Sequence, residues 1–522
     1  MTGHEYFLVP LAILLLGGIL SGLPVAFVLM GVPLLLALIA ASVGAFDLAF
    51  LAAFPSRVFG LVTNPILVSI PLFLLIGNLL ERSDIARRMM LTAGALFGVR
   101  HGGMAYAVII VGALLAASTG LIAATIFMMG MIALPAMIKG GYSNRLSAGL
   151  ICASGSLGQI IPPSILLILL SDQISSAYQA GRRAAGDFAP DPVSVGDLFA
   201  GAMIPGLILV CCYLVYVILL VRVHPKLAPP IRVSQIEGMG SQLTARSVML
   251  ALVAPLLLVV LVLGSILSGI ATPTESAALG AAGALIMVAL NRAPSRFHRL
   301  AYVMVGISAA GLIAMRGTGV VGGGQSHLLG QVAGLFLFAL MMAGVLMAVY
   351  QEGLNGVLGA VAFATAHMVA AILFIVMGAI MLSLVFRGFG GEEVVHQLIL
   401  SMPGGTASAL FVVMAIVFFL GFILEYVEII FIVVPIAGVP LLAAGVDPVW
   451  FAILLTLNLQ TSFLTPPFGY ALFYLRSVAP PSLTTGEIYW SVIPFVIIQL
   501  LVLALIAVIP ETATWLPDTL YN

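Results

Sequence analysis

Two apolar segments, each interrupted by a proline pair, constrain the fold of this chain most. They are residues 149–172, GLICASGSLGQIIPPSILLILLSD, and residues 456–476, TLNLQTSFLTPPFGYALFYLR. Adjacent prolines remove backbone donors and clash with the preceding turn, so each segment is predicted to be a helix that opens at its middle. In lipid, open backbone survives only where protein, ions or a water-filled cavity satisfy its polar groups.

The two breaks lie in corresponding positions of the chain. Aligning Pro162–Pro163 with Pro466–Pro467 gives an offset of 304 residues, which also pairs Gly141 with Gly445 upstream of each break. Broken helices in corresponding halves are typical of a transporter binding site. Two ordinary proline kinks are the simpler alternative, and the shared surroundings of the two pairs argue against it.

The composition places these segments in a membrane. Hydrophobic residues make up 62% of the chain and charged residues 7%, which about 20 apolar residues per bilayer crossing can accommodate and a soluble core cannot. Nineteen basic and nineteen acidic side chains cancel, so the charge does not indicate a nucleic-acid partner. We predict an all-α polytopic membrane protein with about 12 transmembrane helices, at residues 6–20, 24–43, 65–81, 145–171, 199–222, 247–268, 272–290, 300–320, 329–350, 366–386, 449–476 and 488–509.

Two further apolar stretches, 103–138 and 408–443, do not fit as spans. Each holds about 36 residues, too few to cross twice and long for a single crossing. Basic residues flank the first stretch on both sides, and cytoplasmic loops collect Lys and Arg. We therefore predict a re-entrant hairpin with its tip near residues 118–125. Its counterpart should enter from the opposite face with its tip near residues 425–428, so that hairpin and broken helix form an inverted repeat.

The basic residues support one orientation, with both termini outside. This orientation places fourteen of the nineteen Lys and Arg residues in cytoplasmic loops. They are Arg82, Arg87, Arg88, Arg100, Lys139, Arg145, Arg222, Lys226, Arg232, Arg246, Arg292, Arg296, Arg299 and Arg476. Segments 47–62 and 84–99 look amphipathic and are predicted to be connecting arms, whereas 172–197 is predicted to be an exposed external loop.

Uncharged polar groups cluster around both tips and breaks. Hydroxyls, amide oxygens and freed carbonyls suit Na⁺, and half-helix N-termini suit a carboxylate. Mutual capping between packed helices is the alternative for each residue. The candidates in the first half are Ser118, Thr119, Gly120, Thr125, Gly155, Ser156, Gly158, Pro162, Pro163 and Ser164. Those in the second half are Asn458, Gln460, Thr461, Ser462, Thr465, Pro466, Pro467 and Gly469.

Glu425 and Glu428 are carboxylates within an apolar hairpin, where ionisable groups are costly and usually functional. Exposure of one of them to water, or a structural hydrogen bond, is the alternative. The duplicated architecture predicts at least two Na⁺ ions, one at each tip. Ser118 and Ser156 are candidate ligands in the first site, and Thr461 and Thr465 in the second.

Catalytic chemistry is not indicated. The only lysines are Lys139 and Lys226, and neither stands in the G-x-x-x-x-G-K-[ST] motif of ATP hydrolysis. The histidines lie far from the candidate nucleophiles Ser154 and Ser156, so we do not expect an enzyme. No cofactor is predicted other than Na⁺ as the coupling ion.

The chain resembles the large membrane subunit of tripartite ATP-independent periplasmic (TRAP) transporters. The central region, about 290–370, is similar to the long-chain subgroup often linked with 2-oxo acids and related organic acids. The strings that carry the resemblance are IPLFLLIGNLLERS (70–83), GSLGQIIPPS (155–164), ATPTESAA (271–278), FIVVPIAGVP (431–440) and GVDPVWFAILLTLNLQTSFLTPPFGYALFYLR (445–476).

The resemblance implies an elevator-type, Na⁺-coupled importer of an organic anion in a bacterial inner membrane. It also implies two partners, a periplasmic substrate-binding protein and a small four-helix membrane subunit. An autonomous carrier or channel without a binding protein is the alternative. The expected parts are a scaffold in 1–102, transport-domain halves in 103–171 and 408–476, connecting helices in 172–407 and a C-terminal helix and tail in 477–522.

Overall fold

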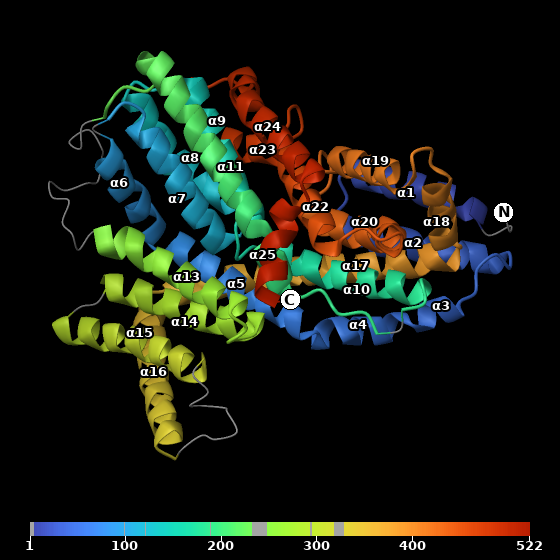
Figure 1. The fold of residues 1–522 in the computed structure, drawn as a ribbon, viewed down its shortest axis with the longest axis horizontal. Coiled ribbons are helices and arrows are strands. Elements are labelled where there is room, and N and C mark those ends of the chain that lie inside the picture. Colours follow the sequence, from blue (N-terminus) through green and yellow to red (C-terminus); the bar gives the residue numbers. More distant parts are fainter. Residues whose placement is uncertain are drawn as a thin grey trace.

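The computed structural model describes residues 5–98, 100–120, 122–187, 189–231, 248–292, 295–317 and 328–521. Every regular element among these residues is helical, and none is a strand, which confirms the all-α class (Figure 1). The first part of the chain forms η1 (Glu5–Phe7), α1 (Leu8–Leu20), α2 (Val25–Ser42), α3 (Ala49–Ala52), α4 (Phe54–Thr63), α5 (Pro65–Arg82), α6 (Ile85–Phe97), α7 (Gly103–Thr119), α8 (Ile122–Lys139), α9 (Asn144–Ser156), η2 (Leu157–Gln159), α10 (Ile165–Ala184), α11 (Val195–Val223) and η3 (Pro225–Leu227).

The remaining helices continue the same all-helical pattern. The central part forms the π-helical turn η5 (Met249–Val253), α13 (Ala254–Leu267), α14 (Pro273–Arg292), α15 (Arg296–Gly317), α16 (Leu328–Leu354) and α17 (Val357–Gly388). The last part forms α18 (Gly391–Ser401), α19 (Gly405–Leu420), α20 (Tyr426–Val433), the π-helical turn η6 (Val434–Gly438), α21 (Val439–Ala443), α22 (Pro448–Leu464), α23 (Tyr470–Val478), α24 (Thr485–Val508) and α25 (Glu511–Tyr521).

Eleven of the described helices are long and apolar enough to cross a membrane, so the chain is a multi-pass membrane protein. Nine of them coincide with predicted spans, and the other two, Ile122–Lys139 and Tyr426–Ala443, are limbs of the predicted hairpins. The three remaining predicted spans are a shorter helix at 5–20 and the two broken helices. The predicted span boundaries therefore largely agree with the structure.

Both predicted hairpins are helix–turn–helix units. In the first, α7 and α8 pack on each other, and Gly120 at the turn has a φ of 62°, which glycine adopts without a Cβ penalty. In the second, α19 ends at a turn from Gly421, and the chain returns as α20, η6 and α21. That each hairpin enters and leaves on one side of a membrane stays a prediction.

The predicted external loop 172–197 is largely wrong, because α10 continues to Ala184. The polar residues that suggested a loop lie on a helix whose partners satisfy them. Asn64 Nδ2 donates to Asp172 Oδ1 at 2.6 Å, and Gln173 Nε2 donates to Asp172 Oδ2 at 2.9 Å. Only the segment before α11 is a connection, and Ser194 and Asp197 form a capping box that starts this helix.

The two segments predicted to be connecting arms are helical. Segment 47–62 contains α3 and the exposed α4, and segment 84–99 contains α6, which is largely buried against α7. Residues 232–247 and 318–327 lie outside the described residues.

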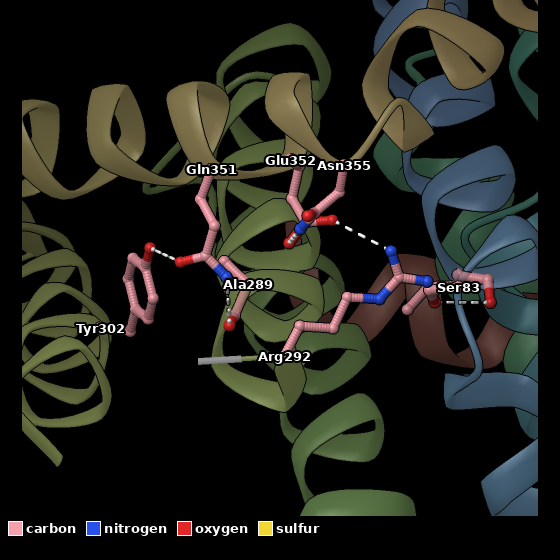
Figure 2. Close-up of polar contacts among 8 residues, drawn as sticks. Ser83, Ala289, Arg292, Tyr302, Gln351, Glu352 and Asn355 are labelled. Carbon is pink, nitrogen blue, oxygen red and sulfur yellow. Dashed lines mark hydrogen bonds and ion pairs between the residues drawn. The ribbon is translucent and has the colours of Figure 1, made fainter. Parts of the chain in front are cut away.

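An ion pair that the sequence analysis did not predict joins the central helices. Glu352 in α16 is fully buried, and Arg292 Nη1 lies 3.3 Å from Glu352 Oε2 (Figure 2). Beside this pair, Tyr302 of α15 donates its hydroxyl to Gln351 Oε1 at 2.7 Å. These contacts hold α15 and α16 against the end of α14, while α14 and α17 pack along α5.

Candidate functional site

The first break lies between η2 and α10 and is buried. Pro162, Pro163 and Ser164 occupy the opening, and the Ser164 hydroxyl donates to the freed carbonyl of Gln159 at 2.8 Å. Ser164 does not cap α10 with its side chain, so the N-terminus of α10 keeps free backbone N–H groups. The prolines thus leave carbonyls on one side of the break and amides on the other.

The first hairpin tip lies against this break. A Cβ on Gly120 would stand 3.2 Å from the backbone nitrogen of Ile165, the first residue of α10. A Cβ on Gly158 would stand 3.3 Å from Ala116 Cα on α7. Both approaches favour glycine, because a Cβ would require the neighbouring atoms to shift, and Gly120 also has a positive φ. A Cβ on Gly155 would collide with the Ile126 side chain of α8.

The side chains of two predicted ligands at the first tip, Ser118 and Thr119, lie outside the described part of the structure. Thr125 is buried within α8 and has an interaction partner. The backbone around the tip therefore defines the first junction.

The second hairpin contacts its broken helix through hydrogen bonds to the backbone. Ser462 Oγ donates to Phe418 O at 2.9 Å, and Asn458 Nδ2 donates to Met414 O at 2.7 Å. A Cβ on Gly421 would collide with Ser462 Oγ, so glycine permits the close approach of the tip to α22.

The hydroxyls of the second break point along their own helix. Thr461 Oγ1 donates to Leu457 O and Thr465 Oγ1 donates to Thr461 O, both at 2.7 Å. Each hydroxyl oxygen keeps lone pairs that can accept a hydrogen bond or coordinate a cation. Pro466 and Pro467 follow, and Gly469 precedes α23 without a side-chain cap. Among the described residues, no group of three or more His, Cys, Asp and Glu could hold a metal ion, so uncharged oxygens predominate.

The two glutamates at the second tip have different environments. Glu428 is buried, and its carboxylate accepts the backbone N–H of Glu425 at the start of α20. Glu425 is exposed, and Tyr474 of α23 donates to its Oε1 at 3.2 Å. The neighbouring Tyr470 donates to Ile423 O at 2.7 Å. The two glutamates thus form a capping box at the start of α20, and Glu425 also connects the tip to the second break.

The two repeats meet at a buried polar centre. Gln460 Nε2 lies 3.5 Å from Ser156 Oγ, and these residues are 304 positions apart, the same offset that separates the proline pairs. Two helices outside the repeats join this contact. Gln499 of α24 donates to Ser156 Oγ at 3.3 Å and to the hydroxyl of Tyr213 of α11 at 2.8 Å.

Sequence reasoning missed Gln499 and Tyr213, although a glutamine within an apolar span such as IIQLLV (497–502) was an available signal. The Ser156 hydroxyl donates to Ala153 O at 2.9 Å and faces α22 and α24. Several buried polar atoms near this centre have no hydrogen-bond partner among the described residues: Ser154 Oγ, both amide atoms of Gln159, Gln460 Oε1 and Gln499 Oε1.

The arrangement of hairpins and breaks matches a known family. A family model described as "Tripartite ATP-independent periplasmic transporter, DctM component" matches residues 12–512. The chain belongs to this family. The resemblance stated from the sequence strings is therefore confirmed, and the chain is a TRAP transporter large permease subunit and not an enzyme.

Individual DctM relatives match most of the chain at low identity. The C4-dicarboxylate TRAP transporter large permease protein DctM of Vibrio cholerae serotype O1 is 26% identical over 454 residues, covering 87% of this chain and 86% of the relative. The sialic acid TRAP transporter large permease protein SiaM of the same organism is 24% identical over 510 residues, covering 96% of each.

A solved structure shares the fold. The YdaH transporter of Alcanivorax borkumensis superposes with a TM-score of 0.54 and 13% sequence identity, covering 89% of this chain and 88% of that chain. At this identity the likeness concerns the architecture alone. It agrees with an all-helical membrane transporter fold for the DctM component described above.

Proposed function

We propose that this DctM component imports an organic acid anion, such as a 2-oxo acid, a dicarboxylate or a related carboxylate, together with Na⁺. The main support for this proposal is the duplicated junction between a hairpin tip and a broken helix. In each junction a tip presses on a break through glycine contacts, and the break supplies freed backbone groups. Relatives named for C4-dicarboxylates and for sialic acid support an acidic substrate.

Sodium would bind where oxygens face each junction. In the second junction the lone pairs of Thr461, Ser462 and Thr465 are available, since each hydroxyl donates its proton to a carbonyl. Glu425 would balance charge there. In the first junction the carbonyls of Gly155 and Gly158 would contribute, with Ser118 and Thr119, while Ser156 faces the polar centre between the repeats.

The substrate carboxylate would lie between the two junctions. The N-termini of α10 and α23 both begin directly after a break without a side-chain cap, so their partial positive charge is available to an anion. Ions and anion in adjacent sites attract one another, so each should bind more tightly when the other is present. We further propose that 103–171 and 408–476 move together as an elevator against α2, α5, α14 and α17.

The working unit would contain two partners in a bacterial inner membrane. A periplasmic binding protein would deliver the anion, and a small four-helix membrane subunit would complete the scaffold. Membership in a tripartite family supports this assembly. An autonomous carrier or channel would work without the binding protein, and the experiment below separates the two.

The test is uptake of radiolabelled carboxylates into proteoliposomes with and without a Na⁺ gradient, the membrane subunit and the binding protein. We expect uptake only with Na⁺ and the complete system, rising sigmoidally with Na⁺ and responding to membrane potential by about 2.3 kcal/mol per net charge per 100 mV. Full uptake in K⁺ buffer on a proton gradient would refute the sodium assignment. Uptake without the binding protein would favour the autonomous carrier.

A further inference from the structure

A polar cavity lies away from the two junctions. It has a volume of about 300 Å³ and is lined by α4, α5, α10, α17, α18 and the segment α20–η6–α21, several of which lie side by side in Figure 1. This volume is at the lower end of the range for small-molecule pockets. The polar residues that line it include Arg57, Asn64, Asp172, Ser176, Arg387 and Glu392.

The cavity opens on the outer side in the topology predicted from the basic residues. Arg57 precedes α5 at its predicted outer end, and Arg387 ends α17 on the same side. Its walls come from both parts of the proposed elevator, because Phe431 and Pro435 belong to the segment 408–476 while Arg387 belongs to α17. An anion arriving from outside would meet this cavity before it reached either junction.

Some charged side chains in the cavity have partners, and Arg57 does not among the described residues. Arg387 Nη2 lies 2.7 Å from Glu392 Oε1, and the Asp172 carboxylate accepts hydrogen bonds from Asn64 and Gln173. In contrast, the Arg57 guanidinium has no ion pair and no hydrogen bond within the described residues. Desolvation and the nearby Arg387 lower the pKa of Arg57, although Glu392 opposes this effect. Arginine nevertheless keeps its charge, so one cationic fork remains available.

We propose that this outer cavity binds the carboxylate group of a small organic acid, with Arg57 as its primary partner and Glu392 as an internal competitor. The planar guanidinium of Arg57 matches a carboxylate in a two-point contact. Glu392 already places a carboxylate on Arg387, which shows that this cavity accommodates such a group beside a guanidinium. An incoming carboxylate can bind Arg57 and compete with Glu392 for Arg387. This inference rests on the proposed import of an organic anion.

The test measures protection of a cysteine in the cavity wall and does not require transport. Ser176 is exposed and lines the cavity, so Ser176→Cys reports its occupancy. Cys211 and Cys212 are accessible and are replaced by serine, whereas the buried Cys152 is kept. The full-length protein is purified in uncharged detergent, and its labelling by a hydrophilic maleimide is timed with increasing succinate, pyruvate or inorganic phosphate.

We expect succinate or pyruvate to slow labelling with saturation. Arg57→Gln should raise the half-protecting concentration about tenfold, the loss expected for one charge-assisted contact, while Arg57→Lys should have a smaller effect. Glu392→Gln should lower that concentration, because it removes the competitor. Arg183→Gln is the matched control, an outer arginine on α10 that bonds Gln179 outside the cavity, and it should change nothing.

Three outcomes would overturn the inference: equal protection in Arg57→Gln, the absence of protection, or protection by phosphate but not by carboxylates, which would indicate a lipid headgroup or phosphate site. Native elution in gel filtration confirms that each variant is folded. The proposed function is tested separately by uptake. Protection without Na⁺-driven uptake would leave the cavity site standing and remove the transport proposal, and the reverse result would remove the cavity site alone.

Discussion

The first hairpin is enclosed by other helices, whereas the second is exposed along its first limb. In α7, Met104, Val108 and Val111 are completely buried, because α5, α6, α8, α9, α11 and α13 surround this helix. In α19, Phe411 and Phe419 are 75% and 63% exposed. The main described neighbours of α19 are α18, α20, α21 and α22, and a groove of about 1010 Å³ separates α19 from α24.

The breaks differ in the same way. Pro162 and Pro163 are buried, while Pro467 and Phe468 are exposed. Regions with fewer buried contacts open at lower free-energy cost. We therefore expect the two units to differ although both belong to the proposed moving part. The first unit is packed tightly within the interior, and the second is the unit whose hairpin we expect to open.

The largest expected effect comes from removing the proline pairs. Each proline in a helix interior costs about 3 kcal/mol relative to alanine, so Pro466→Ala with Pro467→Ala should favour a continuous helix. The second break is exposed, so the protein should still reach the membrane while uptake in proteoliposomes falls to background. The same change at Pro162 and Pro163 lies in a buried region and should also reduce the yield of folded protein.

Unchanged uptake by the Pro466→Ala, Pro467→Ala variant would mean that the break does not form the site. Equal losses of yield at both pairs would remove the distinction between a tightly packed unit and an opening unit. Amounts of membrane-inserted protein, measured alongside uptake, separate these results.

A smaller effect is expected from truncating one side chain in each hairpin. Leu115 of α7 is completely buried, so Leu115→Ala should destabilise the protein by about 2–5 kcal/mol. Phe411 of α19 is 75% exposed, and Phe411→Ala should change stability by less than about 0.5 kcal/mol. Thermal unfolding in detergent checks both. A comparable loss from Phe411→Ala would show that another element covers α19 in the folded protein.

The Na⁺ dependence of uptake should respond more to changes at the exposed second break than to changes at the buried first break. Thr465→Ala removes a proposed ligand, and a contact worth about 1 kcal/mol corresponds to a rise of about fivefold in the Na⁺ concentration for half-maximal uptake. Ser164→Ala removes a buried hydrogen bond to Gln159 O and should lower thermal stability with little change in Na⁺ dependence. The reverse pattern would mean that the ion at the first break governs the Na⁺ dependence.

The sequence predicted the parts of the fold that depend on local pattern. Runs of apolar residues located the spans, and paired prolines located both breaks, because a helix cannot continue through them whatever surrounds it. The hairpin tips followed from length and flanking charge. These features depend on residues close together in the chain.

Features that depend on distant contacts could not be predicted. Gln499 contacts Ser156 across 343 residues and Tyr213 across 286 residues, and no local pattern pairs them. The polar face of α10 looked like a loop because its partner Asn64 lies 108 residues upstream of Asp172. The two hairpins have similar apolar sequences, because apolar side chains suit both lipid and protein neighbours. Their different exposure could therefore not be predicted from the sequence.

The smallest expected effect concerns the hydrogen bond that joins the exposed tip to its break. Tyr474→Phe removes the contact of the Tyr474 hydroxyl with Glu425 Oε1 at 3.2 Å. Because Glu425 is exposed, water replaces much of this bond, and we expect a loss below about 1 kcal/mol. If Glu425 balances the charge of a bound cation, the Na⁺ concentration for half-maximal uptake should rise by less than about fivefold.

Tyr470→Phe is the matched control, because it removes an equivalent hydroxyl bonded to the neutral carbonyl of Ile423. It should affect the maximal uptake rate without changing the Na⁺ dependence. If both variants shifted the Na⁺ dependence equally, the tyrosines would only hold the tip closed, and Glu425 would have no separate electrostatic role. A shift confined to Tyr474→Phe would instead identify the exposed second unit as the place where ion binding and tip movement are coupled.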